Sequence, residues 1–319
     1  MMTTQTPVVV FAGRPEQREA YERDLRAAAG EAGLGMTLVM DPAEADPAAA
    51  DYLILAPSGP VTDFTPYTRL KAILNLWAGV EQALALPLPP GVPLVRMVEE
   101  GLTLGMLDYV TGHVMRHHLD LDRYVGNTTA LPWEANAPPL AAERKVTLLG
   151  LGALGGICAS RLAGLGFQVH GWSRTARYVE GVTCHHGADG LIAALDGASI
   201  LVLLLPQTPQ TVGIVGASAL SRLAPGAAVI NAGRGPLIDD DALLAALDRG
   251  DLGHATLDVF DVEPLPVEHP FWTHPNVTVT PHIASITRSG TASRALVSQI
   301  ARGEAGQPFL HVVERDRGY

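Results

Sequence analysis

Three polar residues, each just after a short apolar run, have side chains suited to acid–base and carboxylate chemistry. Arg234 follows a run that ends at Asn231, Glu263 follows one that ends at Phe260, and His282 follows a third. An arginine in an apolar, glycine-flanked loop favours an anionic partner. A histidine held beside a carboxylate is an imidazolium that can donate a proton near neutral pH. Each residue alone could be a solvated loop residue, but together they suggest a reaction at a bound cofactor.

The cofactor is indicated by Gly150-Leu151-Gly152-Ala153-Leu154-Gly155, a GxGxxG that ends one apolar run and opens an apolar helix. The first glycine permits a tight turn, the second lets the backbone approach a pyrophosphate, and the third lets helix and strand pack closely. The helix N-terminus attracts the anion. A glycine-rich turn without a ligand is the alternative. The context favours a dinucleotide site formed by Gly150, Gly152, Ala153, Leu154 and Gly155.

The end of the next predicted strand bears on the choice between NAD and NADP. NAD enzymes usually place a carboxylate there to bind the ribose hydroxyls. This chain has Trp172-Ser173-Arg174-Thr175 instead. A carboxylate would repel a 2′-phosphate, whereas an arginine and two hydroxyls would bind it. We therefore expect NADP(H), held by Ser173, Arg174 and Thr175, with NAD(H) possible. The alternative is that Arg174 is an ordinary solvated loop residue.

The elements that must position these residues form two series in which short apolar strands alternate with amphipathic helices. The first series of predicted strands is Val8–Ala12, Met36–Met40, Tyr52–Ala56, Ala72–Leu76 and Leu94–Met97. The second is Lys145–Leu149, Gln168–Trp172, Ile200–Leu205, Ala228–Asn231, Ala255–Phe260 and Val277–Thr280. Predicted helices are Glu16–Ala29, Leu104–Val125, Leu154–Leu165, Ala242–Leu247 and Ser289–Arg302. Such alternation is typical of α/β folds with doubly wound parallel sheets.

The last predicted helix comes too late to extend the second sheet, so we expect it to cross back to the first domain. The predicted organisation is a Rossmann cofactor domain (103–287) inserted in a flavodoxin-like substrate domain (1–102 and 288–319). A length of 319 residues fits two domains. The helix Leu104–Val125 is a candidate dimer element, and we expect a homodimer.

Composition excludes several classes of protein. Apolar residues make up 47% and charged residues 17%, as in a packed globular protein rather than a disordered chain. The net charge of −11 argues against a nucleic-acid partner, which would need a basic surface. Two cysteines exclude a disulfide scaffold and suit a reducing compartment. No apolar run has the length of a membrane span or a signal sequence, so we expect a cytoplasmic protein.

A metal site is not expected. The pairs His117-His118 and His185-His186 could suggest one. Neighbouring side chains on a helix or strand point apart, however, and no carboxylate completes a ligand set.

In the order of its motifs the sequence resembles the D-isomer-specific 2-hydroxyacid dehydrogenases. The resemblance is carried by the glycine motif, by Asn231-Ala232-Gly233-Arg234-Gly235, by Leu257-Asp258-Val259-Phe260-Asp261-Val262-Glu263-Pro264 and by Thr280-Pro281-His282-Ile283-Ala284. Within that family, Ile283 to Arg288 looks most like the glyoxylate/hydroxypyruvate reductase A group. The resemblance extends from about residue 50 to the end and is strongest after Lys145.

The resemblance implies NADPH-dependent reduction of a short 2-oxoacid such as glyoxylate or hydroxypyruvate. In that reading His282 gives a proton to the forming alkoxide, Glu263 orients His282 and keeps it protonated, and Arg234 pairs with the substrate carboxylate. It also implies a list of contacts. The additional cofactor residues are Met106, Leu205, Pro206, Thr211, Ala232, Gly233, Arg234, Asp258, His282 and Ala284. The additional substrate residues are Trp77, Ala78, Gly79, Val80 and Arg288.

Two departures from the family pattern are visible, and two other functions stay open. Gly233 stands where the family often has alanine, and Glu81 stands where it usually has aspartate. Neither change removes a charge or a donor. The alternatives are another D-2-hydroxyacid dehydrogenase of the same fold, such as a phosphoglycerate type, and a non-catalytic adaptor that senses nucleotides.

Overall fold

The computed structural model describes residues 6–124 and 137–317 of the chain. Its contacts divide the chain into two units, each with its own sheet and core. Unit 1 comprises Met1–Leu102 with Thr287–Tyr319, and unit 2 comprises Thr103–Ile286. The chain thus leaves unit 1 after residue 102 and re-enters it at residue 287, one residue earlier than the boundary expected from the sequence.

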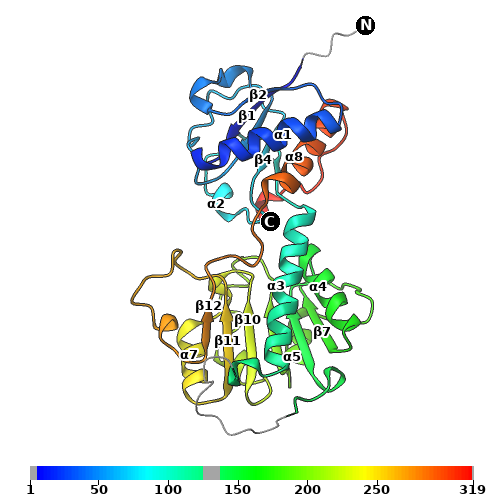
Figure 1. The fold of residues 1–319 in the computed structure, drawn as a ribbon, viewed down its shortest axis with the longest axis vertical. Helices are drawn as coiled ribbons and strands as arrows, with labels where there is room; N and C mark the ends of the chain where they lie inside the picture. The colour runs from blue at the N-terminus through cyan, green and yellow to red at the C-terminus, as the bar shows by residue number, and fades with distance from the viewer. Residues whose placement is uncertain (1–5, 125–136, 318–319) are drawn as a thin grey trace. The chain divides into compact units, whose positions relative to one another are not determined.

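The sheet of unit 1 has five strands, all parallel, in the order β2-β1-β3-β4-β5 (Figure 1). The strands are β1 (Val8–Ala12), β2 (Thr37–Val39), β3 (Tyr52–Leu55), β4 (Ala72–Asn75) and β5 (Leu94–Val95). Helices α1 (Arg18–Glu31) and α8 (Ser289–Glu304) lie side by side on one face, where Leu25 and Leu296 pack against the strands. The short α2 (Glu81–Leu84) and the loops around it cover the other face. Because both faces are covered, the strands are mostly apolar, which is why they could be recognised in the sequence.

The sheet of unit 2 has seven parallel strands in the order β12-β11-β10-β9-β6-β7-β8. The strands are β6 (Lys145–Leu149), β7 (Gln168–Ser173), β8 (Thr183–His186), β9 (Ile200–Leu203), β10 (Ala227–Asn231), β11 (Leu252–Leu257) and β12 (Val277–Val279). The order in which the chain adds strands reverses at β6: β7 and β8 follow on one side of it, and β9 to β12 follow on the other. This is the doubly wound order of a Rossmann fold, and ligands bind outside the carboxyl ends of the strands at that reversal. The predicted α/β class is confirmed.

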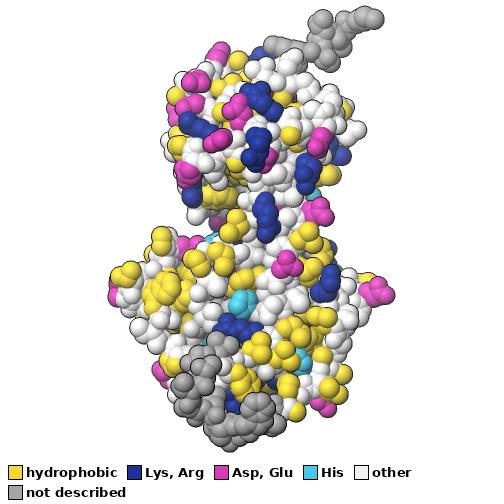
Figure 2. Space-filling model, in the orientation of Figure 1, with side chains coloured by type: hydrophobic (Ala, Val, Ile, Leu, Met, Phe, Trp, Pro, Cys, Tyr) yellow, Lys and Arg dark blue, Asp and Glu magenta, His cyan; other side chains and the backbone are white. Residues whose placement is uncertain are grey.

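Helices cover both faces of the second sheet as well. One face is packed by α3 (Glu100–His118) and α4 (Ala153–Gly164), the other by α5 (Gly187–Leu195), α6 (Ala217–Leu220) and α7 (Asp240–Asp248). None of the helices in the described part of the chain is both long and apolar enough to cross a membrane. On the face shown in Figure 2, acidic and basic side chains are interspersed on each unit.

Several elements differ from the sequence prediction, the short helices α2 and α6 among them. The helix expected over Leu104–Val125 begins at Glu100, capped by the carboxylate of Glu99, and ends at His118; Val125 lies outside the described residues. The edge strand β8 and the helix α5 were not predicted. The sequence of β8 is Thr-Cys-His-His, and an edge strand of polar residues lacks the apolar run by which the other strands were recognised.

Candidate active site

The glycine motif forms the turn between β6 and α4. Gly150 has φ +112°, and a Cβ there would lie 2.7 Å from the carbonyl oxygen of Leu204. A Cβ on Gly155 would lie 1.8 Å from the carbonyl oxygen of Gly150, so only glycine lets helix and strand pack this closely. A Cβ on Gly152 would meet no described atom within 4 Å, so the backbone at the start of α4 faces open space. These are the three properties that a pyrophosphate cradle needs, and the site fits a dinucleotide.

The segment after β7 lies beside that cradle, since β6 and β7 are neighbours. The Ser173 hydroxyl donates to the carbonyl of Thr175 at 2.8 Å, which shapes a tight loop. Arg174 and Thr175 are exposed on it. The loop therefore presents a cation and hydroxyls in the place where NAD enzymes carry an acidic residue.

The loop after β9 borders the cradle from the other side. The hydroxyl of Thr211 donates to the carbonyl of Pro206 at 2.7 Å and accepts from the amide of Thr208 at 2.8 Å. Thr211 thus closes this loop on itself, and Leu205 is buried beneath it. Met106 of α3 is buried in the same apolar cluster as Ala232 and Ala284. The structure therefore brings together three predicted cofactor residues that are far apart in the sequence.

The loop after β10 carries Arg234 and is shaped by the side chain of Asn231. The amide nitrogen of Asn231 donates to the carbonyl of Arg234 at 2.9 Å, and its oxygen accepts from the amide of Gly233 at 3.1 Å. A Cβ on Gly235 would lie 2.0 Å from the carbonyl carbon of Phe260, so this glycine is required for the loop after β11 to approach. At Gly233 a Cβ would lie 2.9 Å from a Leu237 side-chain carbon and 3.0 Å from the oxygen of Leu205. An added Cβ here would therefore be crowded by neighbouring atoms, which favours glycine at this position.

His282 and Glu263 form a hydrogen-bonded pair, with Nδ1 of the imidazole 2.7 Å from Oε2 of the carboxylate. The other carboxylate oxygen of Glu263 accepts from the amide of Phe260 at 3.0 Å. Since a carboxylate accepts hydrogen bonds, Nδ1 carries a proton and Nε2 is the atom that can transfer one. The His282 side chain is 51% exposed, so the ring can reach a bound molecule.

The charges around this pair set its protonation. The hydrogen bond to Glu263 raises the pKa of His282, while partial burial and the positive charge of Arg234 act against that rise. Burial tends to raise the pKa of Glu263, but the hydrogen bonds from His282 and the Phe260 amide, together with the positive charges of His282 and Arg234, lower that pKa overall. Arg234 lies close enough to influence both groups. The structure therefore gathers the three predicted catalytic residues and favours an imidazolium beside a carboxylate.

Asp258 is buried at the end of β11, and its carboxylate accepts hydrogen bonds from the backbone amides of Ile283 and Ala284, both at 2.8 Å. Sequence analysis predicted it only as a cofactor residue. In the structure it holds the segment that carries His282.

In unit 1 the predicted substrate loop Trp77–Val80 follows β4. The side-chain nitrogen of Asn75 donates to the carbonyls of Trp77 (2.7 Å) and Gly79 (2.9 Å), so these two carbonyl oxygens face the Asn75 side chain at the end of β4. The guanidinium of Arg14 lies 5.9 Å from the centre of the Trp77 ring. Sequence analysis missed Asn75. A usable signal was the asparagine that ends an otherwise apolar strand, as Asn231 does in unit 2.

Arg288 stands just before α8, where Nη1 donates to the carbonyl of Gly101 at 3.0 Å. This bond joins the two segments of unit 1 that lead into and out of unit 2. The structure thus gives Arg288 a partner within the protein that the sequence did not predict.

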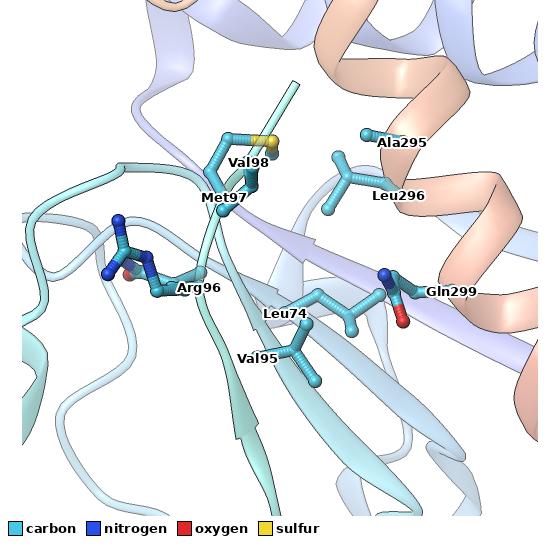
Figure 3. Close-up of a pocket in the computed structure, with 9 residues that line it drawn as sticks. Leu74, Val95, Arg96, Met97, Val98, Ala295, Leu296 and Gln299 are labelled. Carbon is cyan, nitrogen blue, oxygen red and sulfur yellow. The ribbon is translucent and has the colours of Figure 1, made fainter. Parts of the chain in front are cut away.

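Two cavities in the described residues are lined by neither the cradle nor His282. Figure 3 shows a cavity of about 10 Å³ in unit 1 between β4, β5 and α8, lined by Leu74, Val95, Met97 and Leu296 among others. It has room for about one water molecule. A hollow of about 580 Å³ in unit 2 is lined by residues such as Ser199, Gly226 and Asn276. These residues precede strands, so this hollow lies at the edge of the sheet opposite the cradle.

Within residues 6–124 and 137–317, no group of three or more His, Cys, Asp or Glu side chains could hold a metal ion. His170 and His185 do pair, with ring nitrogens 2.9 Å apart. Their rings are 14° from parallel with centres 5.2 Å apart, so the two nitrogens point at each other and share a proton.

Comparisons with known proteins agree with this geometry. Residues 111–284 match the model of the D-isomer specific 2-hydroxyacid dehydrogenase NAD-binding domain. The chain is 42% identical over 257 residues to glyoxylate/hydroxypyruvate reductase A of Serratia proteamaculans, covering 79% of this chain and 82% of that protein.

Two solved structures are similar over nearly the whole chain. One is a D-isomer specific 2-hydroxyacid dehydrogenase from Xanthobacter autotrophicus Py2 in complex with NADPH and MES (TM-score 0.91, 39% identity, covering 99% of this chain and 100% of that one). The other is an NADPH-dependent glyoxylate/hydroxypyruvate reductase from Sinorhizobium meliloti in complex with NADP and sulfate (TM-score 0.88, 38% identity, covering 99% and 100%).

Proposed function

The chain belongs to the D-isomer specific 2-hydroxyacid dehydrogenase family, and on that premise we propose that it uses NADPH to reduce short 2-oxoacids, glyoxylate and hydroxypyruvate among them, to 2-hydroxyacids. The observation that carries the proposal is the 2.7 Å pair of His282 and Glu263 in unit 2, with Arg234 close to both. Similar proteins named as glyoxylate/hydroxypyruvate reductases, one of them as NADPH-dependent, support it.

The cofactor would be held by the cradle and the loops beside it. The pyrophosphate would lie on Gly150, Gly152, Ala153, Leu154 and Gly155, and a 2′-phosphate on Ser173, Arg174 and Thr175. Met106 would contact the nicotinamide, and the other cofactor contacts would be Leu205, Pro206, Thr211, Ala232, Gly233, Arg234, Asp258, His282 and Ala284. The open space at Gly152 supports a bound pyrophosphate, and Arg174 and Thr175, in the place where NAD enzymes carry a carboxylate, support NADPH over NADH. When bound, reduced nicotinamide supplies a hydride to C2 of the oxoacid.

His282 would supply the proton. Its Nε2 is directed away from Glu263, and the hydrogen bond to Glu263 raises the pKa of His282, which favours the charged ring. As the ketone oxygen becomes an alkoxide, the proton on Nε2 passes to it. The imidazole left behind is oriented by the same hydrogen bond to Glu263, ready to take up a proton again.

Arg234 would bind the carboxylate of the oxoacid and polarise its ketone, since a guanidinium fits a carboxylate with two parallel hydrogen bonds. Backbone amides of Trp77, Ala78, Gly79 and Val80 would contribute further donors, and the Trp77 ring would limit the size of the substrate. Arg288 would make a second contact, because a guanidinium has five N–H groups and Gly101 takes one of them.

We further infer a cytoplasmic homodimer that contacts the second copy through α3. The exposed Leu104 of α3 and Ile157 of the neighbouring α4 support such a contact. Mass measurement in solution by light scattering tests it: a molecule of twice 33.6 kDa is expected, and a single chain would contradict it.

The proposed activity is tested by following the absorbance of reduced nicotinamide with a panel of 2-oxoacids and both cofactors. We expect faster turnover of glyoxylate and hydroxypyruvate than of longer oxoacids, and faster turnover with NADPH than with NADH. Turnover restricted to a larger, phosphorylated oxoacid would instead support a phosphoglycerate-type enzyme. Tight NADPH binding without turnover on the whole panel would support a nucleotide-sensing adaptor.

A further inference from the structure

The backbone at His282 has an uncommon conformation that its neighbours must hold in place. Its φ is +53°, in the left-handed region that side-chain-bearing residues rarely adopt. The amide of His282 donates to the carbonyls of Asp258 (2.9 Å) and Thr280 (3.0 Å). A strained residue of this kind persists only where surrounding contacts fix it.

The main contact is the carboxylate of Asp258, which is 1% exposed. One oxygen accepts from the Thr280 hydroxyl at 2.6 Å and from the amide of Ile283 at 2.8 Å; the other accepts from the amide of Ala284 at 2.8 Å. These donors stand on both sides of His282 in the sequence. A single buried carboxylate therefore fixes the segment before and after the histidine.

The direction of the hydrogen bonds beyond Asp258 follows from their chemistry. The hydroxyl of Tyr109, on α3, lies 2.7 Å from the hydroxyl of Thr280. Thr280 has one proton and gives it to Asp258, because a carboxylate can only accept. Tyr109 is then the donor to Thr280. A directed series runs from Tyr109 through Thr280 to Asp258, and it links α3 to the histidine segment.

We propose that Thr280 and Tyr109 are positioning residues, whose hydroxyls hold the Asp258 carboxylate so that it keeps His282 in its productive conformation. The proposal rests on the proposed function, in which His282 is the proton donor. Nothing in the sequence pointed to Tyr109, since its partners lie 149 to 171 residues further along the chain.

The same series acts on His282 through charge. Burial raises the pKa of Asp258, while the hydrogen bonds from Thr280 and the two amides oppose that rise. Three charged groups influence the imidazole: Glu263 and Asp258 raise its pKa, and Arg234 lowers it. Without the Thr280 hydroxyl the Asp258 carboxylate would lose one of the three hydrogen bonds that hold it in place, and its favourable charge interaction with the imidazole would weaken. The pKa of His282 would then fall.

The test compares Thr280→Val, which keeps the branched shape without the hydroxyl, with Thr280→Ser, which keeps the hydroxyl. In Thr280→Val we expect kcat for glyoxylate to fall roughly tenfold, as for a lost hydrogen bond to a charged group. The dissociation constant of NADPH should stay within about twofold, less than 0.5 kcal/mol. The pKa of His282, measured by NMR titration of the full chain, should fall. In Thr280→Ser, which keeps the hydroxyl, kcat and the pKa of His282 should stay close to the wild-type values.

Tyr109→Phe removes only the outer hydroxyl and should shift both quantities in the same direction by less. If Thr280→Val does not fold, the comparison of Tyr109→Phe with the wild type tests the proposal by itself. A folded variant whose kcat and His282 pKa both equal those of the wild type would overturn the proposal. Absence of turnover in the wild type would overturn the proposed function instead, and the NMR titration would still test the positioning.

Discussion

At the scale of single residues, the pair of His282 and Glu263 makes the pH dependence a direct readout of the site. Reduction needs the imidazolium, so kcat/KM should fall as the pH rises through the pKa of His282. Glu263 raises that pKa, mainly through its hydrogen bond. Glu263→Gln keeps an acceptor but removes the charge, so the alkaline fall in kcat/KM should move to lower pH, which a pH–rate profile measures. An unshifted profile would mean that Glu263 does not control the proton donor.

A second prediction at the scale of single residues concerns Arg174, whose charge is expected to distinguish NADPH from NADH. Arg174→Asp should weaken NADPH binding by repulsion and favour the ribose hydroxyls of NADH, changing the ratio of the two kcat/KM values by roughly 10²-fold. Arg177→Asp, on the same exposed loop, is the matched control and should change the ratio little. An equal effect of both changes would show that general charge near the site, rather than Arg174, selects the cofactor.

At the scale of elements, two asparagines at the ends of strands shape the loops of the site. Asn231 holds the Arg234 loop after β10, and Asn75 holds the Trp77–Val80 loop after β4. The orientation of the Asn75 amide is fixed, since a flip would place its oxygen against two carbonyl oxygens. Asn75 thus fixes the backbone of the loop that we propose to bind the substrate carboxylate.

Asn75→Asp tests this role of the loop. An aspartate would set a negative charge against the carbonyls of Trp77 and Gly79 and displace the loop. We expect the KM for glyoxylate to rise about tenfold, from the loss of two buried hydrogen bonds, with NADPH affinity unchanged. Leu74→Val, in the same strand, is the control and should lower the melting temperature without raising KM. A normal KM in folded Asn75→Asp would show that this loop does not bind the oxoacid.

The elements also show what the sequence could and could not predict. Strands covered on both faces, such as β3 and β9, are apolar throughout and were located to within a few residues. The polar edge strand β8 was missed, because its apolar content is too low to distinguish it from a loop. The pairing of Glu263 with His282 was expected from their places after neighbouring strands and from the family resemblance. The bonds from Tyr109 to Thr280 and from Asn75 to its loop depend on tertiary packing that no local pattern encodes.

At the scale of the whole molecule, histidines are distributed unevenly between the units. Of the eleven in the chain, only His311 belongs to unit 1. In unit 2, burial lowers the pKa of His117 to about 3 and that of His113 to about 4. Burial also lowers the pKa of His254. A buried neutral histidine stabilises the fold above its unfolded pKa of 6.5, and that contribution is lost as the pH falls towards the folded value.

Unit 2 should therefore be selectively sensitive to acid. Between pH 7 and pH 5, His117 alone should cost unit 2 about 2 kcal/mol of unfolding free energy. Scanning calorimetry at the two pH values should show one transition moving down in temperature, and by less in His117→Gln. If the wild type and His117→Gln respond alike, the buried histidine is not the source of the sensitivity.

The central claim, that His282 is the proton donor of an NADPH-dependent reduction, is tested most directly by the turnover of His282→Gln with glyoxylate and NADPH. Glutamine fills similar space but cannot supply a proton near neutral pH. The account predicts that kcat falls by roughly 10² to 10⁴, as for the loss of a general acid, while the dissociation constant of NADPH changes little. Turnover equal to that of the wild type would contradict it, because the proton would then come from another group.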